Sequence, residues 1–187
     1  MKNLCRCLLL MFVVPAVMTT PALAQDVPAV EVSGGYNLLK FSDETLPTGW
    51  YADVAGNVTK WLGIVGQVDG NYKTIDVSGV SVKTKLHGFM GGVRINAREN
   101  PNAVPFVQAL FGAMHTTGST TLSGLLPFEV SNSETDSVLQ LGGGVNLMPA
   151  GNIGVRVAAD YMRIFVTNAG TNVFRFGAGV VIPLGKR

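Results

Sequence analysis

Apolar and polar residues alternate with a period of two along most of the chain beyond residue 28, and Gly, Pro and Asn interrupt this alternation about every dozen residues. In one such segment Leu62, Ile64 and Val68 share a face, and Gln67 and Asp69 lie on the opposite one. No segment carries a sustained apolar stripe at helical spacing. The pattern therefore predicts an all-β chain of eight strands, at residues 29–40, 49–59, 62–73, 83–96, 104–116, 134–147, 153–165 and 172–184.

The predicted connections fall into two groups. Turns are expected at residues 59–61, 97–103 and 148–152, and loops at 41–48, 74–82, 117–133 and 166–171. Three turns at one end and four loops at the other, with both termini at the turn end, predict an antiparallel up-and-down barrel. We expect the loops outside the cell and the turns in the periplasm. Protease added to intact cells should then cut within residues 117–133 rather than at an exposed Arg98 in the turn at 97–103.

The segment LGGGVNL, residues 141–147, places three glycines in an apolar run. A dinucleotide-binding loop requires G-x-G-x-x-G between a strand and a helix, but here another alternating segment follows. As a strand, the segment puts Gly142 and Gly144 on one face with Gln140 and Asn146. Inward side chains crowd a small barrel, so small residues must alternate with large ones. The glycines therefore indicate the inner face of a narrow barrel.

Residues 1–24 have the pattern of a cleaved signal peptide. Lys2 and Arg6 form a short positive region, residues 8–18 are largely apolar, and residues 22–24 (Ala-Leu-Ala) match the small-x-small cleavage pattern. A membrane-anchoring helix is the alternative, but the apolar stretch is short against the roughly 20 residues that span a bilayer. We expect cleavage before Gln25.

Cleavage changes the chemistry of the chain that remains, residues 25–187. Cys5 and Cys7 leave with the signal peptide, so we expect neither a disulfide nor a thiol nucleophile. Lys2 and Arg6 also leave, which lowers Lys plus Arg from 14 to 12 against 12 acidic residues. A formally neutral chain argues against a nucleic-acid partner, because such a partner requires a basic surface.

Two kinds of eight-stranded barrel fit this pattern: a soluble, lipocalin-like periplasmic binding barrel and an outer-membrane barrel. The polar face carries about one charge per strand among glycine and alanine, which suits a crowded interior. The apolar face is bulky. Aromatic residues lie near its ends, at Tyr36, Trp50, Tyr72 and Phe174 on the loop side and at Trp61 on the turn side. These features favour a transmembrane β-barrel surrounded by outer-membrane lipids in a Gram-negative cell.

The inward charges are expected to form a structural network in the lumen. Two layers are predicted: Asp53, Asp69 and Asp160 around Arg175 in the loop-side half, and Glu31 with Arg94 and Arg156 near the turn end. A tight turn at residues 59–61 places Asp53 almost opposite Asp69, and the two carboxylates need a shared cation or proton. Paired carboxylates also act as general acid and base. That alternative is disfavoured because a packed lumen admits no substrate.

The last strand, NVFRFGAGVVIPLGKR, resembles the C-terminal strand of small OmpA-like or OmpX-like outer-membrane β-barrel proteins. Gly179, Ile182 and Leu184 match the spacing that the barrel-assembly machinery recognises in that family. The family's terminal aromatic residue is replaced by Gly-Lys-Arg. RVAADYMR, at residues 156–163, is also similar to the family. The resemblance implies an outer-membrane barrel alone, without a peptidoglycan-binding domain.

Function follows less directly from the pattern. A lumen filled by side chains excludes a solute pore, so we expect a structural or surface-interaction role with an unidentified surface ligand. Some barrels resembling this one modify lipid A as acyl hydrolases or acyltransferases, which requires a histidine beside a serine and a carboxylate. His115 has Ser119, Ser123 and Glu129 nearby in sequence, but threonine occupies the serine position of the His-x-Ser spacing. Both histidines, His115 and His87, are expected at the rim or facing lipid, so no enzyme, metal site or cofactor is predicted.

Overall fold

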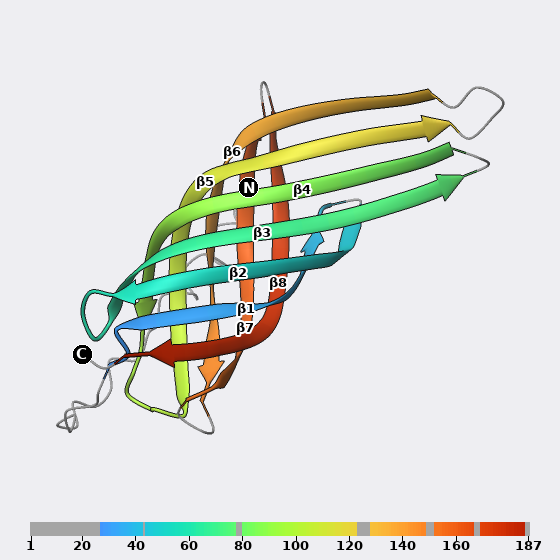
Figure 1. The fold of residues 1–187 in the computed structure, drawn as a ribbon. Coiled ribbons are helices and arrows are strands. Elements are labelled where there is room, and N and C mark those ends of the chain that lie inside the picture. The colour runs from blue at the N-terminus through green and yellow to red at the C-terminus, as the bar shows by residue number, and fades with distance from the viewer. Residues whose placement is uncertain are drawn as a thin grey trace, which may run out of the picture.

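The computed structural model describes residues 27–42, 44–77, 80–122, 128–148, 152–166 and 169–185. They form eight strands, each antiparallel to the next, and β1 pairs with β8 to close the sheet into a barrel (Figure 1). The strands are β1 (Val30–Lys40), β2 (Thr45–Asn57), β3 (Leu62–Val77), β4 (Val80–Asn96), β5 (Ala103–Leu122), β6 (Phe128–Leu147), β7 (Gly154–Val166) and β8 (Ala169–Leu184). The predicted all-β, eight-stranded up-and-down barrel is confirmed. The predicted signal peptide lies outside the described residues.

The two ends of the barrel differ. β1 begins and β8 ends at the same end, which carries the β2–β3, β4–β5 and β6–β7 connections and is called the terminus end below. The other four connections lie at the opposite end, called the projecting end. This arrangement of three and four connections matches the prediction. No helix within the described ranges is long and apolar enough to cross a membrane.

Six strands are longer than predicted, β2 to β6 and β8. β3 continues to Val77 and β4 starts at Val80, while β5 continues to Leu122 and β6 starts at Phe128. Likewise β2 already begins within the predicted loop at 41–48. The predicted loops at 74–82 and 117–133 are therefore largely strand; residues 123–127 lie outside the described part. Thr and Ser are frequent in these extensions, and residues 117–122 in particular form a strand without showing an alternation of apolar and polar residues.

The extensions form a separate four-stranded sheet beyond the barrel. β3 pairs with β2 only as far as Tyr72, and β6 pairs with β7 only from Ser137 onward. The segments at residues 73–77, 80–84, 116–122 and 128–136 therefore extend beyond the closed barrel and pair only within β3 to β6. Figure 1 shows β3 to β6 running together past the other strands to a free end. We call these segments the projecting sheet.

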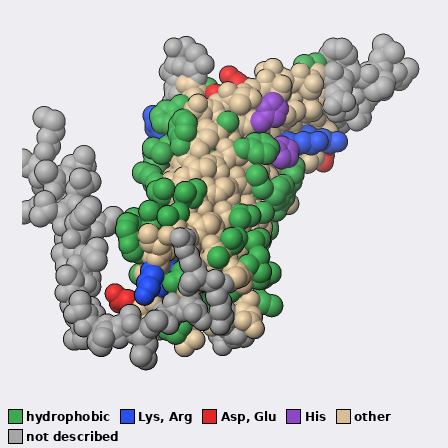
Figure 2. Space-filling model, turned by 60° about the vertical axis from the view of Figure 1, so that its left-hand side comes forward, with side chains coloured by type: hydrophobic (Ala, Val, Ile, Leu, Met, Phe, Trp, Pro, Cys, Tyr) green, Lys and Arg blue, Asp and Glu red, His purple; other side chains and the backbone are tan. Residues whose placement is uncertain are grey.

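The barrel wall has an apolar outer face. Val54, Phe89 and Phe111 point outward and are 51%, 60% and 59% exposed. Figure 2 shows hydrophobic side chains forming a belt around the body of the molecule. On β2 the alternation is strict, because Asp53 and Ala55 are buried on either side of Val54. The predicted inside-out pattern of a membrane barrel is therefore present.

The lumen is divided into a polar and an apolar half. Near the projecting end it is filled by a hydrophobic cluster of Leu39, Leu46, Leu86, Met90, Leu110, Met114, Val138, Met162, Ile164 and Val173. Charged and amide side chains fill the remainder toward the terminus end. The expectation of a polar interior therefore holds for only part of the lumen. In this half of the lumen, inner and outer residues of a strand are often both apolar. The alternation of polar and apolar residues therefore does not show that the lumen is apolar here.

Candidate functional site

Asp53 is the centre of a charge cluster at the terminus-end side of the lumen. Its two carboxylate oxygens accept hydrogen bonds from Arg94 Nη1 at 3.2 Å and Arg156 Nη1 at 2.6 Å. The Ser33 hydroxyl donates a third bond at 2.7 Å. The Phe106 ring lies beside both guanidinium groups, at 4.7 Å from Arg94 and 5.0 Å from Arg156. Asp53 is only 3% exposed, so this is a buried and fully paired carboxylate.

Glu31 extends the same cluster toward the rim. One of its oxygens forms an ion pair with Arg98, which lies in the β4–β5 connection, and the other lies 3.7 Å from Arg156. The side chain of Arg98 is only 13% exposed, so its prediction as an exposed turn residue was wrong. The expected Arg156–Glu31 contact is present. Among the described ion pairs Arg94 binds Asp53 instead of Glu31.

A second cluster surrounds Arg175 in the middle of the lumen. Arg175 donates to Asp160 at 2.7 Å and to Gln67 Oε1 at 3.1 Å. Asp69 is further away, with its Oδ2 atom 3.9 Å from Arg175 Nη1. Gln108 donates to Asp160 at 3.0 Å and thus connects this cluster to the first, because it also accepts from Arg94. Arg175 is therefore shared between two carboxylates and held tightly by one.

The structure corrects the predicted assignment of Asp53. Asp53 is opposite Gln67, while Tyr51 is opposite Asp69. The two carboxylates are therefore diagonal neighbours, and Asp53 belongs with Arg94 and Arg156 at the terminus-end side. No ion pair joins Arg175 to Asp53 among the described contacts. The tilt of strands in a barrel shifts the depth of each residue, and alternation along one strand does not contain that information.

The glycines of the inner face make room for these charges. A Cβ atom built on Gly88 would lie 2.4 Å from Asp69 Oδ1, and one on Gly142 would lie 2.2 Å from Asp160 Oδ1. The carboxyl groups therefore occupy the space that a side chain at either glycine would need. This geometry supports the interpretation of LGGGVNL as a strand on a crowded inner wall.

The lumen offers neither a pore nor a substrate site within the described residues. Arg94 and Arg156 are each 1% exposed, and Gln140 is fully buried. An apolar hollow exists, but it opens on the lipid-facing wall beside Gly143 and Phe176, away from the lumen charges. The described part of the chain also contains no group of three or more His, Cys, Asp or Glu side chains suited to a metal ion.

The two histidines lie on the outer face, and their described hydrogen bonds go to hydroxyl groups instead of carboxylates. His87 and His115 are opposite each other on β4 and β5. His87 Nε2 hydrogen bonds to the Tyr72 hydroxyl at 3.2 Å, and His115 Nδ1 to the Thr135 hydroxyl at 2.8 Å. The side chains of Ser123 and Glu129 lie outside the described residues. A histidine bound to threonine lacks the orienting carboxylate of a hydrolytic triad.

The projecting sheet has two chemically different faces. By strand parity Lys83, Thr117 and Ser133 belong to its outer face. The inner face continues the lumen-facing side of each strand and carries a row of apolar residues formed by Ile75, Val82 and Val130, which are 42%, 38% and 53% exposed. Glu134 and Asp136 lie on the same inner face of β6. Sequence reasoning missed this surface because it treated these segments as loops.

A closed antiparallel barrel with an apolar belt outside and buried charges inside defines a transmembrane barrel of the outer-membrane type. Residues 8–181 match the family model of the outer membrane protein beta-barrel domain, and the chain belongs to this family. The protein is therefore an outer-membrane β-barrel.

Solved structures show the same fold. The attachment invasion locus protein Ail of Yersinia pestis is 17% identical, with a TM-score of 0.56, over 83% of this chain and 99% of that one. Neisserial surface protein A is 14% identical, with a TM-score of 0.58, over 83% of this chain and 96% of that one. No curated protein matches the chain. At this level of identity the likeness is one of fold.

Proposed function

We propose that the protein is a non-catalytic surface-interaction barrel whose projecting sheet binds an extended polypeptide outside the cell. The observation that carries this proposal is the open edge of β6. Residues 128–136 pair with β5 on one side and, within the part of the chain that the structure describes, have no strand on the other, because β7 pairs with β6 only from Ser137. An edge strand with unpaired backbone groups is a template for an added strand.

The open edge of β3 is less suited to such binding. Only residues 73–77 extend beyond the pairing with β2. Lys73 at its start donates to Glu44 at 2.5 Å and to the carbonyl of Thr45 at 3.4 Å, so the β1–β2 connection covers part of this edge. We therefore assign strand addition to β6.

The inner face of the projecting sheet suggests which polypeptide would bind. A strand added to β6 would place alternate side chains beside Val130, Glu134 and Asp136. Apolar residues would extend the exposed row that contains Val130, and basic residues would complement the two carboxylates. We infer that the partner segment is extended and combines apolar with basic residues.

The barrel itself would serve as a rigid anchor. Its lumen is packed by charge clusters and a hydrophobic cluster, so the sheet projects from a fixed base. The Yersinia neighbour is named for attachment, and one of its structures is a complex with the heparin analogue sucrose octasulfate (18% identical, TM-score 0.54). These names agree with a role in attachment for this chain. The proposal itself depends on the open edge of β6.

Assembly into the membrane would use the last strand. Ile182 and Leu184 point outward and are 40% and 48% exposed, while Gly179 approaches Gly35 of β1 so closely that a Cβ on Gly179 would lie 2.8 Å from Cα of Gly35. We propose that these three β8 residues present the assembly signal to the barrel-assembly machinery, after removal of residues 1–24 as a signal peptide.

The binding proposal can be tested with synthetic peptides. The probe is a fluorescent valine–lysine peptide as long as the β6 edge, with valine beside Val130 and lysines beside Glu134 and Asp136 on one face and threonine at the alternate positions. It is titrated against the protein in lipid nanodiscs and followed by anisotropy. Binding should weaken when alternate peptide amides are N-methylated, because strand addition depends on backbone hydrogen bonds. It should also weaken when glutamate replaces lysine. Equal binding of the N-methylated peptide would show that β6 does not act as an edge template.

A further inference from the structure

Four basic or imidazole side chains cluster on the outer face of β4 and β5, at the base of the projecting sheet. Lys83, Lys85 and His87 are alternate residues of β4, so their side chains share one face. His115 is directly opposite His87 on β5. Figure 2 shows histidine and basic side chains together immediately above the hydrophobic belt. We call Lys83, Lys85, His87 and His115 the collar cluster.

The apolar belt begins one step below this cluster. Phe89 follows His87 by two residues on the same face and is 60% exposed, and Phe111 on β5 is 59% exposed. Two residues along a strand span about 7 Å. The collar cluster therefore lies at the depth where hydrocarbon gives way to headgroups.

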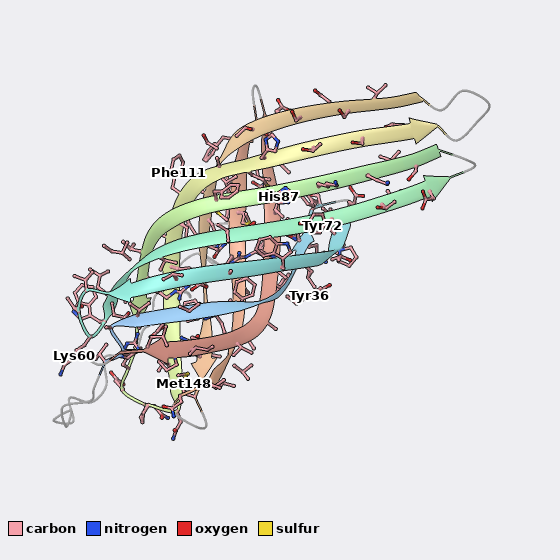
Figure 3. All side chains as sticks on the ribbon, in the orientation of Figure 1. Tyr36, Lys60, Tyr72, His87, Phe111 and Met148 are labelled. Carbon is pink, nitrogen blue, oxygen red and sulfur yellow. The ribbon has the colours of Figure 1, made fainter. Side chains whose placement is uncertain are left out.

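Interfacial aromatic residues mark the same depth on the neighbouring strands. The Trp50 indole donates to the Tyr72 hydroxyl at 3.2 Å, and that hydroxyl contacts His87 (Figure 3). A Cβ atom on Gly70 would lie 2.6 Å from the Trp50 indole nitrogen, so the glycine allows the indole to lie against β3. Trp and Tyr prefer the membrane–water interface. The chain of contacts from Trp50 to His87 thus holds the collar at the bilayer surface.

The collar carries more basic than acidic groups. No ion pair involves Lys83 or Lys85 among the residues that the structure describes. Glu134 and Asp136 belong to the opposite, inner face of β6. On the outer face, the described acidic residue of β3 is Asp76, which is a diagonal neighbour of Lys83, because Thr74 is opposite Lys83 and Ser81 is opposite Asp76. Lys85 lies one step further from Asp76 and beside the histidines.

We propose that the collar cluster binds the phosphate group of a lipid headgroup in the surrounding leaflet. A phosphorylated lipid would place its acyl chains against Phe89 and Phe111 and its phosphate beside Lys85 and the histidines. Ammonium and imidazolium groups donate hydrogen bonds to phosphate oxygens, and basic residues at a membrane surface attract anionic headgroups. This site is separate from the open edge of β6 and does not depend on a protein partner.

Tryptophan quenching can test the site directly. The chain contains two tryptophans, Trp50 beside the collar and Trp61 in the connection at the terminus end. With Trp61→Phe, Trp50 reports on the collar; with Trp50→Phe, Trp61 reports on the other end. Each protein is placed in phosphatidylcholine bilayers with a small fraction of acyl-brominated phosphatidate or of brominated phosphatidylcholine. Phosphatidate should be preferred about 25-fold near Trp50, since each of the two lysines near anionic headgroups contributes about fivefold.

Variants distinguish lipid binding at the collar cluster from a nonspecific electrostatic attraction between the protein and anionic lipid. Lys83→Gln with Lys85→Gln should remove the preference seen by Trp50, and Lys83→Arg with Lys85→Arg should retain it. Lys60→Gln, in the terminus-end connection, removes a charge elsewhere and should leave Trp50 quenching unchanged. Heat-modifiable migration on gels verifies that each variant is folded. Equal quenching by the two lipids, or a preference that survives the double glutamine variant, would overturn the proposal.

Two further measurements test the ligand and the histidines. His87→Gln with His115→Gln should weaken the phosphatidate preference seen by Trp50 at constant pH; an unchanged preference would exclude the histidines from the site. Sucrose octasulfate in solution should leave the preference in place, because the acyl chains hold the lipid at the belt. If the soluble polyanion erases it, the collar binds free anions and the assignment to a lipid is wrong.

Discussion

Four of the eight strands of the barrel wall continue into the projecting sheet, but the residues of the wall and of the sheet meet different surroundings. Val54 in the wall and Val130 in the sheet are 51% and 53% exposed, yet one faces lipid and the other faces water. Asp53 in the lumen binds two arginines, while Asp76 in the sheet is exposed and has no ion pair among the described contacts. Valine and aspartate thus stabilise the fold when they lie in the barrel wall, and they form part of the water-exposed surface when they lie in the projecting sheet.

The lumen shows a second contrast, between its two charge clusters. Arg94, Arg98 and Arg156 surround Glu31 and Asp53, which gives three positive charges against two negative ones. Around Arg175 the ratio is one positive charge to two carboxylates. Together the clusters hold four charges of each sign. Charge balance is therefore reached across the lumen, with Gln108 linking the two groups.

The largest effect is expected from Asp53→Ala. The change leaves Arg94 and Arg156 buried without their shared carboxylate, which typically costs about 3–5 kcal/mol. The matched control is Asp76→Ala in the projecting sheet, which should change stability by no more than about 0.5 kcal/mol. Urea unfolding of each variant in lipid bilayers measures both values. Similar losses in the two variants would remove the distinction between wall and sheet.

Removing Arg175 tests the second cluster. Arg175→Ala should cost about 3 kcal/mol, because two buried carboxylates lose their cation. Asp160→Asn in the same chain should recover part of that loss, since Asp160 is the tight partner at 2.7 Å. Asp53→Asn should not recover it, because Asp53 belongs to the other cluster. A double-mutant cycle from unfolding titrations gives both coupling energies, and additive effects for Arg175 and Asp160 would contradict the assignment.

An arginine introduced at an exposed valine shows whether that position contacts lipid or water. Val54→Arg places a cation in the apolar belt, at a cost of about 2–4 kcal/mol if the position is near the bilayer midplane. Val130→Arg starts from almost the same exposure but should be tolerated within about 0.5 kcal/mol. The measurement is again the unfolding free energy in bilayers. Equal costs would place both valines in the same surroundings.

The same contrast explains what the sequence could predict. A wall between lipid and a packed lumen forces strict alternation, so the faces of Val54, Asp53 and Arg156 followed directly from the pattern. Strands such as residues 117–122 carry threonine and serine on both faces, so they show no such alternation and were predicted as loop. The fold could therefore be predicted from the sequence, but the length of the strands beyond the barrel could not.

The members of the charge clusters were predicted better than their contacts. Inward parity identified Asp160 and Arg175 as neighbours, and the last hairpin brings them together. The partner of Asp53 depends on strand tilt across several strands, which one sequence does not contain. Arg98 lies outside any strand, so periodicity carried no information on where its side chain would reach.

The smallest effect on stability is expected from shortening the projecting sheet itself. Gly118 and Asn132 are directly opposite each other, so residues 119–131 can be replaced by an Asn-Gly turn without changing the register of β5 and β6. The described side chains of the removed segment contribute nothing to the lumen clusters or to the apolar belt, and its strand hydrogen bonds are exchanged for bonds to water. The unfolding free energy should change by less than about 1 kcal/mol, and heat-modifiable migration should persist. Binding of the valine–lysine peptide should weaken, because only residues 132–136 of the open edge remain. A loss of stability as large as that of Asp53→Ala would instead show that wall and sheet unfold as one cooperative unit.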